Sequence, residues 1–371
     1  MAKVSIIGLG YVGRSLAKAA SGVAGLEVIG VDRSGRARKD AESDGGSYEI
    51  TDHMPRIAGS DIYVVCVATP LTDGYPNDQH VIAAAKAIEK HATPGALAIL
   101  ESTVQIGIME KEFNPVISRA GMLAAFSPER INPGDTKATI HNTPKIVSGM
   151  TPEAIDKAVA FYSMFVDNVV RVDDVRVAEA SKLLENSYRL LNISFINEFA
   201  MSCKKAGIDP KAVIEAASTK GFGFEPFYPG AGVGGHCIPV DPGFLTYYMS
   251  KLGMPLTILE SAMEFNDSMP DKIVLDLQRS VRQIENKRIL IVGMAYKPDV
   301  NDTRNSPGSL LYEKLRAMGY SVSWHDEVVK TYNHHPSTPI DPSFDVIVVT
   351  IKHEGLDLSG INESKIFDYS A

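Results

Sequence analysis

The stretch KVSIIGLGYVGRSLAKAA, residues 3–20, decides the fold. It contains a short apolar strand pattern, then Gly8, Gly10 and Gly13 in G-x-G-x-x-G spacing, then a helical pattern. The next predicted strand, EVIGVD, ends at Asp32, 19 residues after Gly13. Such glycines make a tight turn and admit a pyrophosphate to the helix N-terminus, while the acid binds the ribose hydroxyls. The stretch therefore predicts a Rossmann domain with a nicotinamide or flavin site. A glycine turn that only packs the strand on the helix is the alternative.

Asp32 also bears on the choice of cofactor. A carboxylate repels a 2′-phosphate, so Asp32 favours NAD over NADP. Three arginines that follow could soften this preference or form a solvated basic turn: Arg33, Arg36 and Arg38. We predict NAD, bound by the glycine turn and the acid: Gly8, Gly10, Tyr11, Val12, Gly13 and Asp32.

Further apolar segments predict strands that end in polar or small residues: 61–70, 97–104, 121–130 and 145–150. Ligands bind at the C-terminal edge of the strands in a doubly wound sheet. Thr69, Thr103 and Glu129 are predicted to lie there, whereas Cys66 is predicted to be a core residue because its surroundings are apolar.

A long helix is predicted from about Asp174 to Gly207. Four of its polar residues fall close to one face: Lys182, Asn186, Arg189 and Asn197. This stripe either faces solvent or a dimer partner, or Lys182 and Asn186, one turn apart, point together into a cleft as cationic and amide donors. Cys203 on the same helix is predicted to be a small core residue.

The loop GVGGHCIPVDP, residues 232–242, places three glycines and a histidine before Cys237. Glycines permit close approach and positive φ, so the loop suggests cleared space around a nucleophilic thiol. Asp241 begins the next predicted helix, where it either caps the helix or works beside the thiol. From about residue 287 a second strand-helix-strand unit follows without a dinucleotide fingerprint. Its first loop suits a phosphate-bearing ligand and holds four polar residues: Lys297, Asp302, Thr303 and Arg304.

Composition limits the classes of protein that fit. A chain of 371 residues predicts two or three domains, and 37 basic against 45 acidic residues give a formal charge of −8, which provides no basic field for nucleic acid. Three cysteines argue against a disulfide scaffold and favour a reducing compartment. No apolar run approaches the roughly 18 residues of a membrane span, and the first residues do not form a signal peptide pattern. We expect a cytoplasmic protein without a membrane segment, nucleic-acid partner or metal site.

Taken together, the motifs resemble the UDP-glucose/GDP-mannose dehydrogenase family over essentially the whole chain. The resemblance is carried by GLGYVG, CVATP, EST, SPERINPG, EASKLLENSYRLLN, GVGGHCIPVDP and AYKPDVNDTRNSP. It implies an α/β fold with an N-terminal NAD-binding Rossmann domain at 1–175 and a central helical domain at 176–284. The central domain would dimerise through the long helix, giving a homodimer or higher oligomer. A C-terminal Rossmann-like nucleotide-sugar-binding domain would occupy 285–371.

The resemblance also implies a reaction. NAD-dependent four-electron oxidation would convert the C6 alcohol of a nucleotide sugar to a uronic acid. Cys237 would form a thiohemiacetal and then a thioester, and Lys182 and Asn186 would stabilise the oxyanions. Glu129 would position or activate the hydrolytic water, and Asp241 would assist proton transfer. Thr69 and Thr103 would lie beside the cofactor, and four cations would contact the substrate: Arg130, Lys220, Lys297 and Arg304.

Two departures from the family bear on the substrate. Pro133 stands where glucose-type members carry a second glutamate, and Gly221 stands where the family places an arginine, for which Lys220 would substitute. SPERINPGDTKATIHNTPKIVSG and FYPGAGVGGHCIPVDP are most similar to the branch that acts on UDP-GlcNAc or UDP-ManNAc. A UDP-glucose or GDP-mannose 6-dehydrogenase is the alternative. A two-electron β-hydroxyacid dehydrogenase and a non-catalytic nucleotide-sugar sensor are more distant ones.

Overall fold

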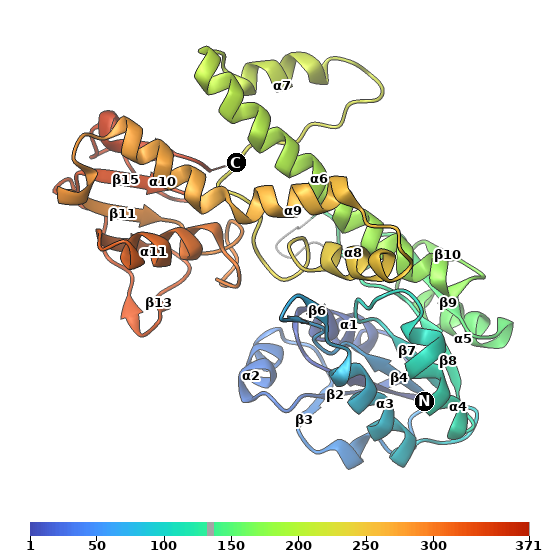
Figure 1. Ribbon diagram of the computed structural model, residues 1–371. Helices are drawn as coiled ribbons and strands as arrows, with labels where there is room; N and C mark the ends of the chain where they lie inside the picture. The colour runs from blue at the N-terminus through green and yellow to red at the C-terminus, as the bar shows by residue number, and fades with distance from the viewer. Residues whose placement is uncertain (132–136, 371) are drawn as a thin grey trace. The chain divides into compact units, whose positions relative to one another are not determined.

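The glycine turn lies, as predicted, between strand β1 (Ala2–Ile7) and helix α1 (Tyr11–Ser21) of the computed structural model, which describes residues 1–131 and 137–370 (Figure 1). The chain divides into two compact units. The first comprises Met1–Glu185 and Gly243–Gly253, and the second comprises Asn186–Pro242 and Met254–Ala371. The long helix α6 (Val175–Ala206) contributes to both units, close to the predicted bounds of 174 and 207.

An eight-stranded sheet forms the described core of the first unit, in the order β10-β9-β8-β7-β4-β1-β2-β3. Its pairs are parallel except β8–β9, an antiparallel pairing that the sequence did not predict. The remaining strands are β2 (Leu26–Val31), β3 (Glu49–Thr51), β4 (Ile62–Val65), β7 (Leu97–Leu100), β8 (Leu123–Phe126), β9 (Lys145–Gly149) and β10 (Val169–Arg171). A separate hairpin consists of β5 (Leu71–Thr72) and β6 (Tyr75–Pro76).

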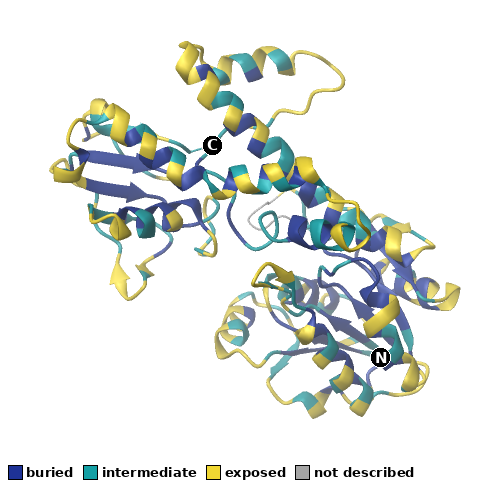
Figure 2. Ribbon diagram, in the orientation of Figure 1, coloured by how far each residue is buried: buried dark blue, intermediate teal, exposed yellow. Residues whose placement is uncertain are grey.

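Helices cover both faces of this sheet, because successive strand residues point to opposite sides. Ile7 and Val65 pack with α3 (Gln79–His91) and α4 (Asn114–Arg119), whereas Ile6 and Val64 pack with α1 and α5 (Pro152–Tyr162). Figure 2 shows the strands as the most deeply buried elements of the unit. The other helical segments here are α2 (Gly35–Ser43), η1 (Met54–Ile57), η2 (Met109–Phe113) and most of α8 (Asp241–Lys251).

The second unit contains a smaller parallel sheet in the order β12-β11-β15-β16. Its strands are β11 (Arg288–Val292), β12 (Ser321–His325), β15 (Val346–Val349) and β16 (Ile366–Asp368), with a hairpin of β13 (Thr331–Tyr332) and β14 (His335–Pro336). One face, including Ile289 and Ile291, packs on helices α10 and α11. The helical segments are α7 (Pro210–Ser218), α9 (Thr257–Asp267), α10 (Met269–Ser280), η3 (Ile284–Asn286), α11 (Pro307–Ala317) and η4 (Glu363–Lys365).

Side-chain caps fix the N-terminal ends of several helices. Asp209 caps α7 by accepting the Lys211 N–H, and Ser306 caps α11 by accepting the Ser309 N–H. Asp241 is the first residue of α8. In the described part of the chain, no helix combines the length and apolar character that a membrane crossing requires.

Candidate functional site

The glycine turn of the first unit has the shape of a pyrophosphate cradle. Gly8 has φ +96°, and a Cβ there would lie 2.5 Å from the Cys66 carbonyl oxygen. A Cβ on Gly13 would lie 1.8 Å from the Gly8 oxygen, so both positions require glycine. A Cβ on Gly10 would meet nothing within 4 Å, and Gly10 provides no side-chain cap for α1. The N-terminal end of α1 thus begins beside open space at Gly10, and a helix N-terminus is where a pyrophosphate binds.

Asp32 directly follows β2 and retains hydrogen-bonding capacity for a ribose. Its Oδ2 accepts the Leu9 N–H at 2.7 Å and its Oδ1 accepts the Ser34 N–H at 2.7 Å. The residue is partly exposed, and each carboxylate oxygen can accept another donor. Arg38 is engaged within the fold, since it donates to the Asp32 carbonyl oxygen and pairs with Asp52 at 3.0 Å. This donor and acceptor set fits NAD.

Thr69 and Thr103 follow two neighbouring parallel strands, β4 and β7, at their C-terminal ends. Both are partly exposed. The Ser102 hydroxyl donates to the Val67 carbonyl oxygen at 2.7 Å and so links the two segments that carry the threonines. Val12, in the first turn of α1, is also partly exposed. The predicted cofactor residues thus all lie at the turn or at the C-terminal edge of one sheet.

Glu129 belongs to a buried ionic cluster whose other members sequence reasoning missed. Lys145, the first residue of β9, has its Nζ 3.1 Å from Glu129 Oε2 and 3.1 Å from Glu101 Oε1. Tyr162 on α5 donates a hydrogen bond to Glu101. The available signal was a lysine that opens an apolar strand, and its carboxylate partners are distant in the chain. The predicted site residue is therefore held by a lysine rather than exposed at the strand end.

The two carboxyl groups of this cluster have opposite protonation tendencies. Burial raises the pKa of Glu101 to about 7, although Lys145 opposes the shift. Burial also acts on Glu129, but the Lys145 ammonium and two backbone N–H donors outweigh it and lower the pKa of that carboxyl. Glu129 is thus the carboxylate that stays ionised. Nearby, burial raises the pKa of the Cys66 thiol well above its usual value, which suits an unreactive core cysteine.

Other charged side chains of the first unit fix α6 and its surroundings. Glu179 accepts the backbone N–H groups of Gly107 and Met109 at 2.6 and 3.0 Å, and burial outweighs these donors in raising its pKa to about 7. Arg130 pairs with Glu185 at 2.7 Å and is partly buried.

Lys182, one turn beyond Glu179 on α6, is partly buried, and its ammonium has no ion-pair partner among residues 1–131 and 137–370. It is therefore available as a cationic donor.

Pro133, on which part of the substrate prediction rests, lies outside the described residues.

In the second unit three predicted catalytic residues come together. The Cys237 carbonyl oxygen accepts the Asp241 N–H at 2.8 Å, which closes the turn that leads from the cysteine into α8. Asp241 is buried, and its Oδ2 accepts a hydrogen bond from Asn186 Nδ2 at 2.5 Å. Asp241 therefore begins α8 and also holds the Asn186 amide. Cys237 itself is partly exposed.

The glycines before Cys237 serve a purpose different from the one expected. A Cβ on Gly234 would lie 2.6 Å from the Asn305 carbonyl oxygen, and a Cβ on Gly235 would lie 2.9 Å from the Tyr296 ring. The Gly235 N–H also donates to the Arg304 carbonyl oxygen at 2.9 Å. The space that these glycines leave is thus filled by the loop after β11 rather than kept for a substrate. Glycine is needed because two backbone segments meet there.

The remaining polar residues of the second unit occupy varied settings. Asn197 of the α6 stripe is buried and accepts the Gly230 N–H at 2.7 Å, so it anchors the cysteine loop. Arg304 Nε lies 3.0 and 2.9 Å from the two carboxylate oxygens of Asp302. Lys220 is exposed, with its Nζ 4.8 Å from the centroid of the Phe222 ring. Lys297 is partly buried in the loop after β11.

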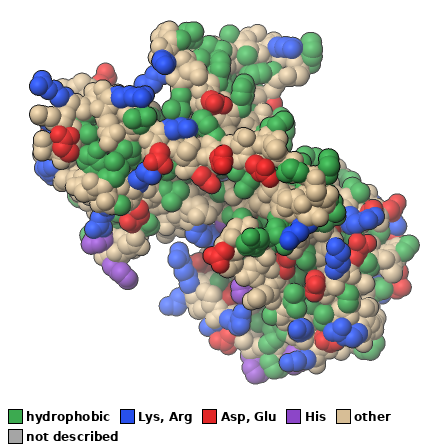
Figure 3. All heavy atoms as spheres, viewed as in Figure 1, with side chains coloured by type: hydrophobic (Ala, Val, Ile, Leu, Met, Phe, Trp, Pro, Cys, Tyr) green, Lys and Arg blue, Asp and Glu red, His purple; other side chains and the backbone are tan. Residues whose placement is uncertain are grey.

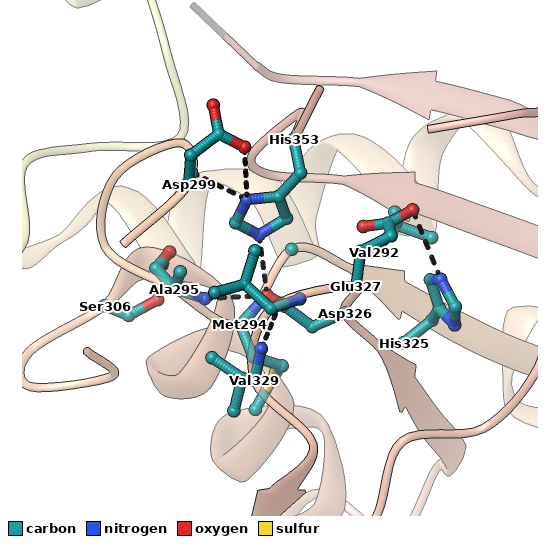
Figure 4. A network of polar contacts seen from close by, with 12 residues as sticks. Val292, Met294, Ala295, Asp299, Ser306, His325, Asp326, Glu327, Val329 and His353 are labelled. Carbon is teal, nitrogen blue, oxygen red and sulfur yellow. Dashed lines mark hydrogen bonds and ion pairs between the residues drawn. The ribbon is translucent and has the colours of Figure 1, made fainter. Parts of the chain in front are cut away.

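The C-terminal sheet repeats the geometry of the dinucleotide turn. Gly293 has φ +97°, and a Cβ on Gly308 would lie 2.0 Å from the Gly293 oxygen. A Cβ on Gly13 would meet the Gly8 oxygen in the same way. Asp326 follows β12 as Asp32 follows β2, but its carboxylate accepts five donors: the backbone N–H groups of Met294, Ala295, Val328 and Val329, and the His353 imidazole (Figure 4).

Burial alone would raise the pKa of Asp326, but His353 and the backbone donors lower it to about 2. Buried and fully hydrogen-bonded, this carboxylate has no capacity left for a ribose. The second turn therefore does not bind a dinucleotide as the first can.

Comparison with known proteins identifies the family. The NAD binding domain of the UDP-glucose/GDP-mannose dehydrogenase family matches residues 38–166, its central domain matches 176–268 and its UDP binding domain matches 290–366. The UDP-N-acetyl-D-glucosamine 6-dehydrogenase of Salmonella typhi is 31% identical over 98% of this chain and 93% of its own length. The UDP-N-acetyl-D-mannosamine dehydrogenase of Campylobacter jejuni is 32% identical over 84% and 83%.

A solved structure agrees with the sequence relatives. The structure of UDP-D-ManNAc dehydrogenase from Pyrococcus horikoshii has a TM-score of 0.87 at 28% identity, covering 99% of this chain and 95% of that one. These matches confirm the predicted resemblance, the α/β fold of three domains and NAD as the cofactor. The chain belongs to the UDP-glucose/GDP-mannose dehydrogenase family, and it is an NAD-dependent nucleotide-sugar dehydrogenase.

Proposed function

We propose that the protein oxidises the C6 alcohol of a UDP-N-acetylhexosamine, UDP-GlcNAc or UDP-ManNAc, to the uronic acid. The observation that carries this proposal is the constellation of Cys237, Asp241 and Asn186, in which the cysteine begins the turn into α8 and a buried carboxylate holds an amide donor. The acetamido sugar is supported by the relatives, which are named for UDP-N-acetylglucosamine and UDP-N-acetylmannosamine.

The roles of the residues follow from their chemistry. The glycine turn, Asp32, Thr69 and Thr103 would hold NAD, which would supply the hydride acceptor for both oxidations. The Cys237 sulfur adds to the aldehyde carbon as a thiohemiacetal, which becomes a thioester on oxidation. Lys182 and Asn186 donate to the oxyanions, and Asp241 assists proton transfer.

Glu129 acts on the water that hydrolyses the thioester. Arg130, Lys220, Lys297 and Arg304 contact the substrate in the same proposal. Arg130 and Arg304 would then exchange their present partners for the substrate.

The proposal also includes a cytoplasmic location and the domain bounds 1–175, 176–284 and 285–371. Limited proteolysis that cuts inside these domains first, or fractionation that finds the protein outside the cytoplasm, would contradict them.

A turnover screen tests the substrate. We expect kcat/KM for UDP-GlcNAc or UDP-ManNAc to exceed that for UDP-glucose at least about tenfold, a difference of about 1.4 kcal/mol in transition-state binding. A pocket built for an acetamide leaves a void or unpaired polar groups when it receives glucose. UDP-GalNAc and GDP-mannose complete the screen, with NAD and NADP side by side. Faster UDP-glucose turnover would refute the substrate, and equal use of NADP would refute the role of Asp32.

We further propose a homodimer formed through α6. Leu184, Tyr188 and Phe195 are 65%, 45% and 65% exposed, an apolar stripe on a helix that also has a buried face. Figure 3 shows hydrophobic side chains gathered over α6 and α7. An exposed apolar stripe of this kind is typical of a subunit interface.

The oligomeric state in solution tests the interface. We expect the double variant Leu184→Asp, Phe195→Asp to sediment as a monomer and the wild-type chain as a dimer, because charges in an apolar interface remain unpaired. Ile258→Asp, at a residue of α9 that is 78% exposed, is the control and should stay dimeric. A monomeric wild-type chain at micromolar concentration would contradict the proposal.

A further inference from the structure

Lys145 is the centre of the buried ionic cluster in the first unit. Lys145, Glu101 and Glu129 are 4%, 1% and 9% exposed, and Tyr162 is fully buried. The Lys145 Nζ lies 3.1 Å from one oxygen of each glutamate and 4.9 Å from the centroid of the Tyr162 ring. These residues come from the end of β7, the segment after β8, the start of β9 and α5, so the cluster joins four separate elements.

The hydrogen bonds of the cluster are distributed unequally. Glu129 Oε1 accepts the backbone N–H groups of Arg130 and Ile131 at 2.6 and 2.7 Å, and Oε2 accepts from Lys145. Glu101 Oε1 is shared by Lys145 and Tyr162, while Glu101 Oε2 has no partner among the residues that the structure describes. Glu129 is consequently fixed in position as an anion. Glu101 is the group on which a proton is tolerated.

Stability alone does not account for such an arrangement. Burying an ammonium and two carboxyl groups carries desolvation penalties that apolar residues of similar size avoid. A buried ion pair is therefore weak evidence for a stabilising role. An ion pair that fixes a carboxylate already proposed to act on water has a more specific purpose.

We propose that Lys145 is the positioning residue of the hydrolytic step, holding Glu129 ionised and correctly placed, with Glu101 as its second counter-charge. The proposal rests on the function proposed above. In that step the water oxygen bonds to the thioester carbon and one water proton passes to Glu129. The carbon–sulfur bond breaks, Cys237 leaves as a thiolate, and the second proton dissociates from the uronic acid product.

The pH dependence follows from the groups that face Glu129. Lys145 faces it from β9, and Glu101, just after β7, lies across the ammonium. Tyr162 flanks them from α5, and Cys66 lies nearby after β4. Loss of the Lys145 ammonium disfavours the Glu129 anion, so the pKa of Glu129 rises. The acid limb of the pH profile, where kcat falls as Glu129 becomes protonated, then moves to higher pH. Loss of the Glu101 carboxyl leaves that limb in place, because Glu101, with a pKa of about 7, is already protonated where the lower-pKa Glu129 titrates.

Rapid-mixing kinetics separates hydrolysis from oxidation. Lys145→Met should still release a burst of two NADH per active site, while the steady-state rate falls at least about tenfold, because a general base contributes about 10²- to 10⁴-fold. The acyl-enzyme on Cys237 should then accumulate in intact-protein mass spectra. Lys145→Arg should restore most of the rate. Lys157→Met, which breaks an exposed pair with Glu153, is the matched control and should behave as wild type.

Several results would overturn the proposal. An unchanged steady-state rate and pH profile in Lys145→Met would do so, and so would a burst that falls as much as the steady state. Lys145→Gln, which keeps a polar side chain between the two carboxyl groups, gives a second test if Lys145→Met does not fold: an acid limb that stays in place would reject the cluster. Failure of the proposed function is separate, because the wild-type enzyme would then show neither two NADH per substrate nor an acyl-enzyme.

Discussion

Replacing Cys237 by alanine lowers the rate of uronate formation at least about 10³-fold, the scale on which loss of a catalytic nucleophile acts. The second oxidation requires the aldehyde carbon to be bound covalently as a thiohemiacetal, and Cys237 is the thiol proposed to bind it. The measurement is product analysis together with NADH released per UDP-sugar consumed. Wild type should release two NADH, and the variant should form no acid.

The other two cysteines are the controls for this experiment. Cys203 is buried on α6, and Cys66 lies beside the glycine turn with a pKa that burial raises. Serine at either position should at most lower thermal stability and should leave the ratio of two NADH per substrate intact. Near-wild-type acid production by Cys237→Ala would refute covalent catalysis. One NADH per substrate in the wild type would indicate a hydroxyacid-type dehydrogenase, and none would indicate a sensor.

The part of the site that sequence predicts well is built from local signals. Gly8, Gly13 and Asp32 lie within one strand-turn-helix-strand unit, so their spacing in the chain determines their positions in space. The same holds for Cys237 and Asp241, which one turn of backbone joins. Here local geometry leaves few alternatives, and the structure agrees with the pattern.

Contacts between distant segments were less accessible. Glu101, Glu129 and Lys145 meet only because β7, β8 and β9 are neighbours, and the antiparallel β8–β9 pairing has no signal in hydrophobic periodicity. Likewise, Gly234 and Gly235 were interpreted as space for a substrate, whereas the Tyr296 side chain and the Asn305 backbone fill it. A glycine indicates that something approaches closely, but it does not indicate what approaches.

Asn186→Ala should lower kcat about 10²- to 10³-fold, the effect of removing one oxyanion donor. Two losses combine in this variant. The amide that donates to the developing oxyanion is absent, and the buried Asp241 carboxylate loses its 2.5 Å hydrogen bond. Steady-state turnover with a saturating UDP-sugar measures the effect. Asn192→Ala is the matched control and should stay near wild type, because the hydrogen bond that its side chain donates goes to the Tyr188 carbonyl oxygen of the same helix.

A double-mutant cycle then separates the two roles of Asn186. If the amide acts only by holding Asp241, then Asn186→Ala combined with Asp241→Ala is no slower than the slower single variant, because the second change removes nothing further. If Asn186 also donates directly to the oxyanion, the double variant is slower than either single variant. The hydrogen bond uses one of the two protons on Nδ2, which leaves the other to donate, so we expect the slower double variant. An Asn186→Ala enzyme within threefold of wild type would remove Asn186 from the catalytic site altogether.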